Sequence, residues 1–186
     1  AIQAGKVAAV MGFLLVAIFM FIYYWFAGLV ANVALFLDVV LLPSALVLVA
    51  NVLGVFAKDA TMGGSGSLAL PVLTMPGIAG LVLTLGMAVD ANVLIFERIR
   101  EELKKGMTAF EAVQAGFSRA SVSILDSNLT TLITAAILYQ FGTGPIRGFA
   151  VTLSLGILAS MFTAIFVSRA IFESWVKRSS TQKISV

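Results

Sequence analysis

Residues 76–105 change abruptly from apolar to charged and read PGIAGLVLTLGMAVDANVLIFERIREELKK. Between Pro76 and Phe96 the sequence contains one charged residue, Asp90, and after Phe96 acidic and basic residues follow in quick succession. About 20 mostly apolar residues are enough for a helix to cross the hydrocarbon core of a bilayer. We therefore expect a transmembrane helix over 76–96 that ends at a charged membrane surface.

The composition of the whole chain agrees with a membrane protein. Of 186 residues, 60% are hydrophobic and 11% are charged, and the mean hydropathy is +1.07. Soluble domains carry about 25% charged residues and cannot hide so much apolar surface. Four further apolar stretches are long enough to span, at residues 7–26, 29–49, 122–139 and 146–175. The sequence predicts an all-α polytopic bundle of five transmembrane helices.

The segments between these spans complete the expected organisation. Residues 98–119 are rich in Glu, Lys and Arg, and their apolar residues recur every three or four positions, which predicts an amphipathic helix along the membrane interface. Residues 63–67, GGSGS, indicate a flexible external loop, and both a native and an inserted or engineered origin stay open. The predicted segments are 1–57 (two spans), 58–74 (loop), 75–97 (third span), 98–120 (amphipathic segment), 121–176 (two spans) and 177–186 (tail).

Basic residues predict the orientation of the bundle. The charged segment and the tail together hold eight, namely Arg98, Arg100, Lys104, Lys105, Arg119, Lys177, Arg178 and Lys183, whereas the opposite side holds three, Lys6, Lys58 and Arg147. Cytoplasmic loops carry the excess of Lys and Arg. We expect a cytoplasmic C-terminus and an external N-terminus, and hence a chain that continues a longer protein after an external domain.

The available chemistry is narrow. The chain has no cysteine and no histidine, so thiol chemistry is excluded and the usual proton carrier near neutral pH is missing. Nucleotide-binding, dinucleotide-binding, metalloprotease and hydrolase motifs are also absent from the sequence. We expect no enzyme activity, cofactor, metal or nucleic-acid partner, and any proton transfer has to use carboxylates driven by the membrane gradient.

Asp90 is the main candidate. It lies six residues before Phe96, roughly 9 Å inside the hydrocarbon at the helical rise per residue. An aspartate at such a depth costs at least ~2.5 kcal/mol, so it should face protein or water and is a candidate proton carrier. The alternative is a buried polar residue that only bonds a neighbouring helix.

Two other acids lie within predicted spans. Asp126, Thr130 and Thr134 follow one another at four-residue spacing, with Ser127, Asn128 and Thr131 beside them. This ladder fits a proton path or simple helix–helix hydrogen bonding. Asp38, in the second span, has apolar neighbours, and a protonated structural role is the default reading.

Small residues predict where helices pack closely. Gly80, Thr84 and Ala88 recur every four residues in the third span, and Gly156 and Ser160 belong to a similar stripe in the fifth. Such residues allow close backbone approach in membranes. Gly86, one turn before Asp90, would let another helix close in beside the carboxylate.

Residues 75–103, MPGIAGLVLTLGMAVDANVLIFERIREEL, resemble the fourth transmembrane helix of the SecD family of protein-export membrane proteins. Segments 21–32, 126–133 and 142–150 resemble the same family in the same order. The resemblance implies a resistance-nodulation-division fold, with SecF, separate or fused, as the second half. It also implies the bacterial inner membrane, preprotein substrates and association with the SecY–SecE–SecG channel and YidC.

In that family Asp90 matches an intramembrane aspartate that works with an aspartate and an arginine of SecF as a proton relay. The resemblance then gives a supporting role to the polar residues nearby, which are Asn92, Asp126, Asn128, Thr130 and Thr131. The expected function is proton-driven assistance of preprotein export. The alternatives are an efflux or lipid transporter of the same superfamily and a non-catalytic scaffold of the translocase.

Overall fold

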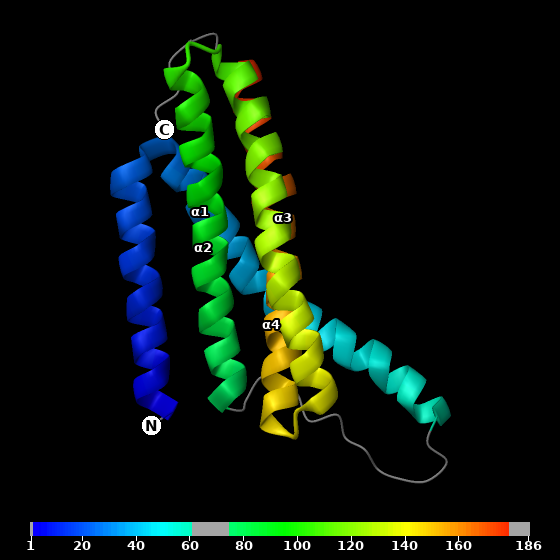
Figure 1. Cartoon of the computed structure of the whole chain (residues 1–186). Helices are drawn as coiled ribbons and strands as arrows, with labels where there is room; N and C mark the ends of the chain where they lie inside the picture. Colours follow the sequence, from blue (N-terminus) through cyan, green and yellow to red (C-terminus); the bar gives the residue numbers. More distant parts are fainter. Residues whose placement is uncertain (1, 61–74, 179–186) are drawn as a thin grey trace.

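The computed structural model describes residues 2–60 and 75–178, and these residues form a helical bundle (Figure 1). Its elements are α1 (Ile2–Ala60), α2 (Met75–Lys104), α3 (Ala109–Phe141), α4 (Pro145–Phe162), the π-helix η2 (Thr163–Val167) and α5 (Ser168–Arg178). Four described helical stretches are long and apolar enough to cross a membrane, at 27–48, 75–104, 109–141 and 145–177. A shorter apolar stretch, Val10–Trp25, precedes them. The predicted all-α polytopic bundle is confirmed.

A sharp bend divides α1 into the first two predicted spans. Trp25 has φ 47° and ψ −109°, a conformation outside the helical region, and the chain reverses there (Figure 1). Gly28 makes the reversal possible, because a Cβ at this position would collide with the backbone carbonyl of Met20. After the bend, the second half of α1 crosses behind α2 in Figure 1 and packs against α2 and α4.

Residues 98–119 do not form the separate interfacial helix that the sequence predicts, so this part of the prediction is wrong. Helix α2 continues to Lys104 and α3 begins at Ala109, so the charged residues belong to two helix ends joined by a tight turn. Gly106, with φ 87°, lies in the turn that follows α2, and Thr108 caps α3 in a capping box with Glu111. The apolar residues whose spacing suggested an amphipathic helix are divided among α2 (Leu103), the turn (Met107) and α3 (Phe110 and Val113), and of the four Val113 alone is buried.

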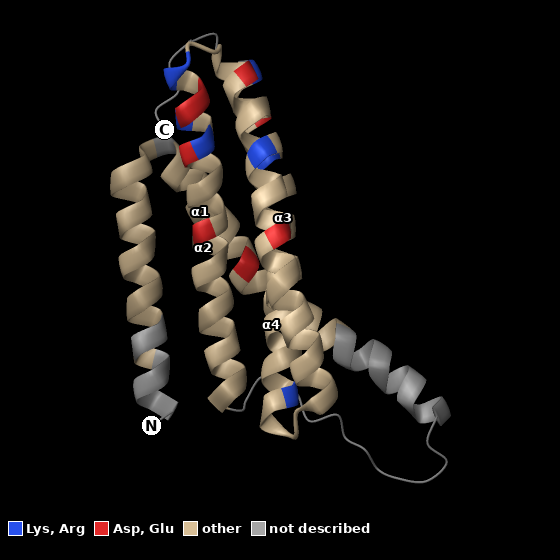
Figure 2. Cartoon of the chain, viewed as in Figure 1, with Lys and Arg blue, Asp and Glu red and all other residues tan. Residues whose placement is uncertain are grey.

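Figure 2 shows that Lys, Arg, Asp and Glu gather at this end of the bundle, while most of its length is tan. At the opposite end of the bundle, a short loop at residues 142–144 joins α3 to α4. Lys58 to Ala60 end α1, whereas positions 61–74 of the predicted loop and 179–186 of the predicted tail lie outside the described residues.

Two apolar clusters hold the helices together. In the larger one, the Phe96 ring of α2 and the Phe117 ring of α3 lie 5.7 and 5.9 Å from the Phe172 ring of α5. In the smaller one, Ala135 of α3 packs with Leu153 and Ile157 of α4. All six side chains are buried, so the bundle has its own core within the described helices.

The predicted fifth span is one continuous rod of α4, η2 and α5. Inside it, the backbone N–H of Ser168 donates to the carbonyl of Thr163, five residues earlier, instead of four. Such single π-helical turns are rare and widen the helix locally.

Candidate functional site

Asp90 lies on the outside of the bundle. Its side chain is exposed, and among the described residues it forms no hydrogen bond or ion pair. Gly86, one turn earlier, is exposed too, and a Cβ placed there would meet no atom within 4 Å. No described helix of this chain therefore closes over Asp90 or Gly86.

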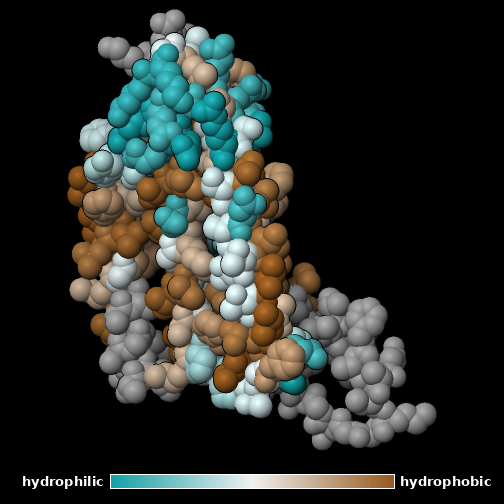
Figure 3. Space-filling view, viewed as in Figure 1, coloured by the Kyte–Doolittle hydropathy of each residue, from teal (hydrophilic) through white to brown (hydrophobic). Residues whose placement is uncertain are grey.

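The polar ladder of α3 is also on the outside. Asp126, Thr130 and Thr134 are exposed, and Figure 3 shows a pale stripe along α3 between brown, apolar flanks. The threonine hydroxyls donate to carbonyls of their own helix: Thr130 to Asp126 at 3.2 Å and Thr134 to Thr130 at 3.0 Å. Thr131 likewise donates to Ser127 at 3.3 Å. Within the described bundle this ladder bonds no second helix.

The two asparagines lie on the inside. Asn92 is fully buried, its amide donates to the Ala88 carbonyl at 3.0 Å, and it accepts from the Ser168 hydroxyl of α5 at 3.3 Å. Asn128 of α3 is 9% exposed. Each follows an exposed aspartate by two residues, which is a rotation of about 200° around a helix. The structure thus separates the polar residues into an outer set near Asp90 and an inner set that packs the bundle.

Asp38 of α1 is inside the bundle as well. It is 3% exposed, and its Oδ1 accepts a hydrogen bond from the Thr163 hydroxyl of η2 at 2.6 Å. No other hydrogen bond reaches the carboxyl group from a described residue, and Oδ2 is buried without a partner. The sequence offered no signal for the Thr163 pairing, because the two residues are 125 positions apart.

The small residues bring α2 and α4 together. A Cβ at Gly156 of α4 would collide with the side chain of Thr84 of α2, and one at Gly80 would lie 3.3 Å from the Phe149 ring. Ser160 is buried and its hydroxyl donates to the Ile157 carbonyl at 3.1 Å. Gly80, Thr84 and Gly156 thus occupy the α2–α4 contact, while Gly86 lies away from it.

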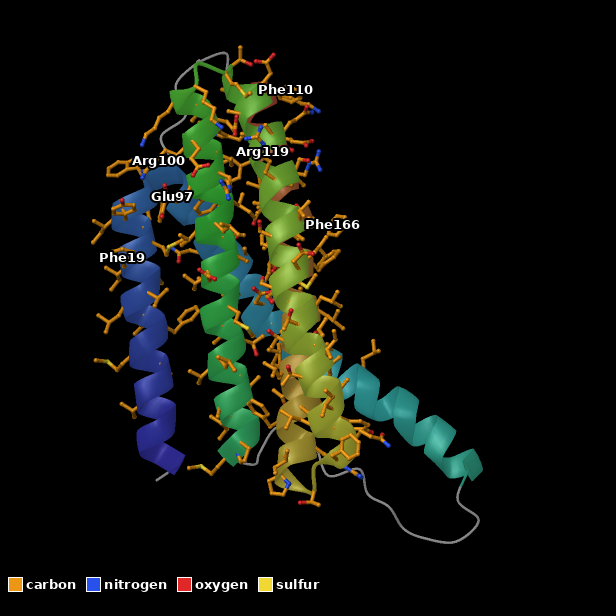
Figure 4. All side chains as sticks on the ribbon, in the orientation of Figure 1. Phe19, Glu97, Arg100, Phe110, Arg119 and Phe166 are labelled. Carbon is orange, nitrogen blue, oxygen red and sulfur yellow. The ribbon has the colours of Figure 1, made fainter. Side chains whose placement is uncertain are left out.

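Sequence reasoning missed two polar clusters at the charged end. The Tyr24 hydroxyl, beside the bend of α1, donates to Glu97 of α2 at 3.0 Å, and Arg100 pairs with Glu97 at 3.1 Å. The Arg100 guanidinium also lies 5.5 Å from the ring centroid of Tyr23. Figure 4 shows Glu97 and Arg100 next to the bend. This cluster fixes the bend of α1 to α2.

The second cluster joins α2 to α3. The Glu102 side chain is fully buried, and its Oε1 accepts from Lys105 at 2.8 Å and from Arg119 of α3. Both cations remain more than half exposed. Charge-assisted bonds of this kind are about twice as strong as neutral ones. Nothing in the sequence distinguished Glu102 from its exposed neighbour Glu101.

Chemically, the outer face combines a carboxylate, a small residue and a row of hydroxyls. Hydroxyls and carboxylates can exchange protons with water, and the exposed glycine leaves room for a neighbouring helix. Within the described part of the chain, no three acidic side chains come together to hold a metal ion.

These features define a class: a polytopic α-helical membrane bundle with an unpaired carboxylate on one outer face. The chain matches the family "Protein export membrane protein SecD/SecF, C-terminal" over residues 1–178. The chain belongs to this family.

Relatives and a solved structure agree. The chain is 51% identical over 185 residues to the protein translocase subunit SecD of Magnetococcus marinus and 47% identical over 185 residues to that of Calditerrivibrio nitroreducens. Both matches cover 100% of this chain, and 31% and 32% of the relatives, so the chain spans about a third of their length.

The crystal structure of SecDF from Thermus thermophilus, a translocon-associated membrane protein, aligns with a TM-score of 0.77 and 41% sequence identity. The alignment covers 98% of this chain and 23% of that chain. SecDF is a member of the resistance-nodulation-division superfamily, which agrees with the fold implied by the sequence resemblance.

Proposed function

We propose that this chain is the membrane part of a SecD-type subunit of the Sec protein translocase, in which Asp90 binds and releases protons to couple the proton gradient to preprotein export. The observation that carries the proposal is the position of Asp90. It is exposed on an apolar helix and has no ionic partner among the described residues of its own chain. A charge in hydrocarbon without a partner is costly, so this face has to meet protein or water.

A second half-bundle fits this face. Gly86 leaves space beside the carboxylate, and the hydroxyl row of α3 adds a polar surface. We propose that SecF, separate or fused, packs here and supplies a cation for Asp90. A carboxylate that alternates between this cation and water would gain and lose a proton in two states of different access.

The charged end of the bundle supports the orientation. With the basic residues of the α2–α3 turn in the cytoplasm, the two ends of the described helices would face opposite sides of the bacterial inner membrane. The proposal includes a cytoplasmic C-terminus and an external N-terminus. We propose preproteins as the substrate of the assembled translocase, and the SecY–SecE–SecG channel and YidC as its partners.

The test is the Asp90→Asn exchange in the full-length protein, assayed for proton-gradient-dependent preprotein export in membrane vesicles. The matched control is Glu101→Gln, which alters an exposed carboxylate at the charged end that pairs with Arg98. We expect at least a tenfold loss of gradient-dependent stimulation for Asp90→Asn, with complex assembly unchanged, and normal stimulation for the control.

Full stimulation with Asp90→Asn would contradict the proton relay and favour the scaffold alternative, in which only the small-residue contacts matter. Gradient-driven efflux of a lipid or small molecule that depends on Asp90, without any effect on export, would favour the transporter alternative instead.

A further inference from the structure

Of the three carboxylates within the apolar segments, Asp38 alone lies on the inside of the bundle, whereas Asp90 and Asp126 are exposed. Asp38 is 3% exposed and lies where the second half of α1 packs against η2. A buried ionised carboxylate is strongly disfavoured unless a cation or several donors stabilise it. Here one donor, the Thr163 hydroxyl, reaches Oδ1 at 2.6 Å, and Oδ2 is buried without a hydrogen-bond partner among the described residues.

The charged groups around Asp38 do not compensate for a negative charge. In its apolar part, residues 76–96, helix α2 contributes Asp90, which is exposed and acidic. The first turn of α4 contains Arg147, which donates to the Gly142 carbonyl, and η2 contains no ionisable residue. On α5, Arg169 pairs with Glu173 at 2.7 Å. On α1 itself, the other ionisable residues between positions 7 and 57 are Tyr23 and Tyr24 at the bend.

The hydroxyl of Thr163 has two possible acceptors. Its Oγ lies 2.6 Å from Asp38 Oδ1 and 3.1 Å from the Ser160 carbonyl, but a hydroxyl carries one proton to donate. When Asp38 is ionised, Thr163 donates to the carboxylate. When Asp38 is protonated, the acid O–H donates to Thr163 Oγ, and Thr163 donates to Ser160. Both arrangements use the same oxygen positions.

We propose that Asp38 and Thr163 form a second proton-binding site, in which Asp38 carries the proton on Oδ1 while α1 is packed against η2. In this state Oδ2 is a neutral carbonyl-type oxygen, and leaving it unpaired costs far less than leaving half of a carboxylate charge unpaired. The bound species is one proton, taken from water and returned to water when this helix contact opens.

The π-helical turn supports the assignment. Thr163 is the first residue of η2, and π-helical turns occur frequently at functional sites. The turn places Thr163, fully buried, against a residue on a different helix that is 125 positions away. This site does not depend on the export role proposed for Asp90.

The test is infrared spectroscopy of the full-length protein in lipid bilayers at neutral pH. We expect the difference spectrum between the unmodified protein and Asp38→Asn to show the loss of one C=O band of a protonated carboxylic acid. Glu101→Gln, an exposed carboxylate at the charged end, is the control and should leave this band unchanged. Thr163→Val should shift the band to higher frequency, because the acid O–H loses its acceptor, and Thr163→Ser should restore it.

The absence of an Asp38-dependent band, or a band that does not move with Thr163→Val, would overturn the proposal. Loss of the band when sodium replaces potassium in the buffer would also overturn it and assign a cation site instead. If Asp38→Asn prevents folding, the comparison of Thr163→Val with Thr163→Ser gives the same decision.

Discussion

Asp90 and Asn92 lie two residues apart on α2, yet Asp90 is exposed on the outer face and Asn92 is fully buried against Ser168 of α5. The same arrangement recurs on α3, where Asp126 is exposed and Asn128 is 9% exposed. In both helices the carboxylate faces out of the bundle and the amide faces inward, and on α2 the Asn92 amide joins the helix to α5 through Ser168. Function and stability should therefore respond to different members of each pair.

The first prediction separates the members of the α2 pair. Asn92→Ala removes a buried amide and leaves the Ser168 hydroxyl without this acceptor, which should lower the free energy of unfolding by about 1–3 kcal/mol. Asp90→Ala should change it by less than about 0.5 kcal/mol in the absence of a partner subunit, as surface substitutions do. Reversible unfolding in mixed micelles measures both. Equal effects of the two exchanges would contradict the inside–outside assignment.

The second prediction concerns the glycines. Gly156→Val forces a side chain into Thr84 across the α2–α4 contact, and such overpacking typically costs about 1–3 kcal/mol. Gly86→Val is the matched control, because open space surrounds this position in the described bundle. The thermal midpoint of the purified chain should fall for the first variant only.

In the full-length complex, Gly86→Val should in turn weaken association with the proposed second half-bundle, measured by co-purification. A variant that lowers neither stability nor association would show that nothing packs on Gly86.

The third prediction concerns Glu102. Glu102→Ala removes the acceptor shared by Lys105 and Arg119 and should loosen the α2–α3 hairpin. Hydrogen exchange at the amides of the α2–α3 turn should become faster, and the thermal midpoint should fall. Glu101→Ala, which breaks only an exposed pair with Arg98, should have little effect. Faster exchange in both variants alike would contradict a specific role for the buried carboxylate.

The fourth prediction concerns the start of α3. The Thr108 hydroxyl accepts from the Glu111 amide, and the Glu111 carboxylate accepts from the Thr108 amide at 3.1 Å. Thr108→Ala should destabilise the protein by about 1 kcal/mol, and Thr108→Ser should retain the cap. Calorimetry in detergent gives the comparison. Similar losses for both variants would indicate that the cap is not the source of the effect.

The apolar runs could be read directly from the sequence. Residues 76–96 and 122–139 lie within α2 and α3, and 146–175 lies within the rod of α4, η2 and α5. Length and hydropathy are enough to find these spans. Backbone N–H and C=O groups left without hydrogen bonds are too costly in lipid, so only helices and closed barrels span a membrane. The sequence predicted where the charged residues lie, but not that they belong to the ends of two helices. Periodicity alone does not reveal that α2 continues to Lys104 and that α3 begins at Ala109.

The sequence also identified Asp90, Asp126 and Asp38 as the acids of the apolar segments, since depth within a span follows from counting residues. Only the tertiary structure decided that Asp90 and Asp126 face outward while Asp38 faces Thr163 inside the bundle. The physical reason is rotational: which side of a helix is buried depends on where neighbouring helices pack, and those contacts join residues far apart in the chain. The sequence predicted the break between the first two spans at residues 27–28, next to the bend at Trp25, but it gave no signal for the π-helical turn that places Thr163 against Asp38.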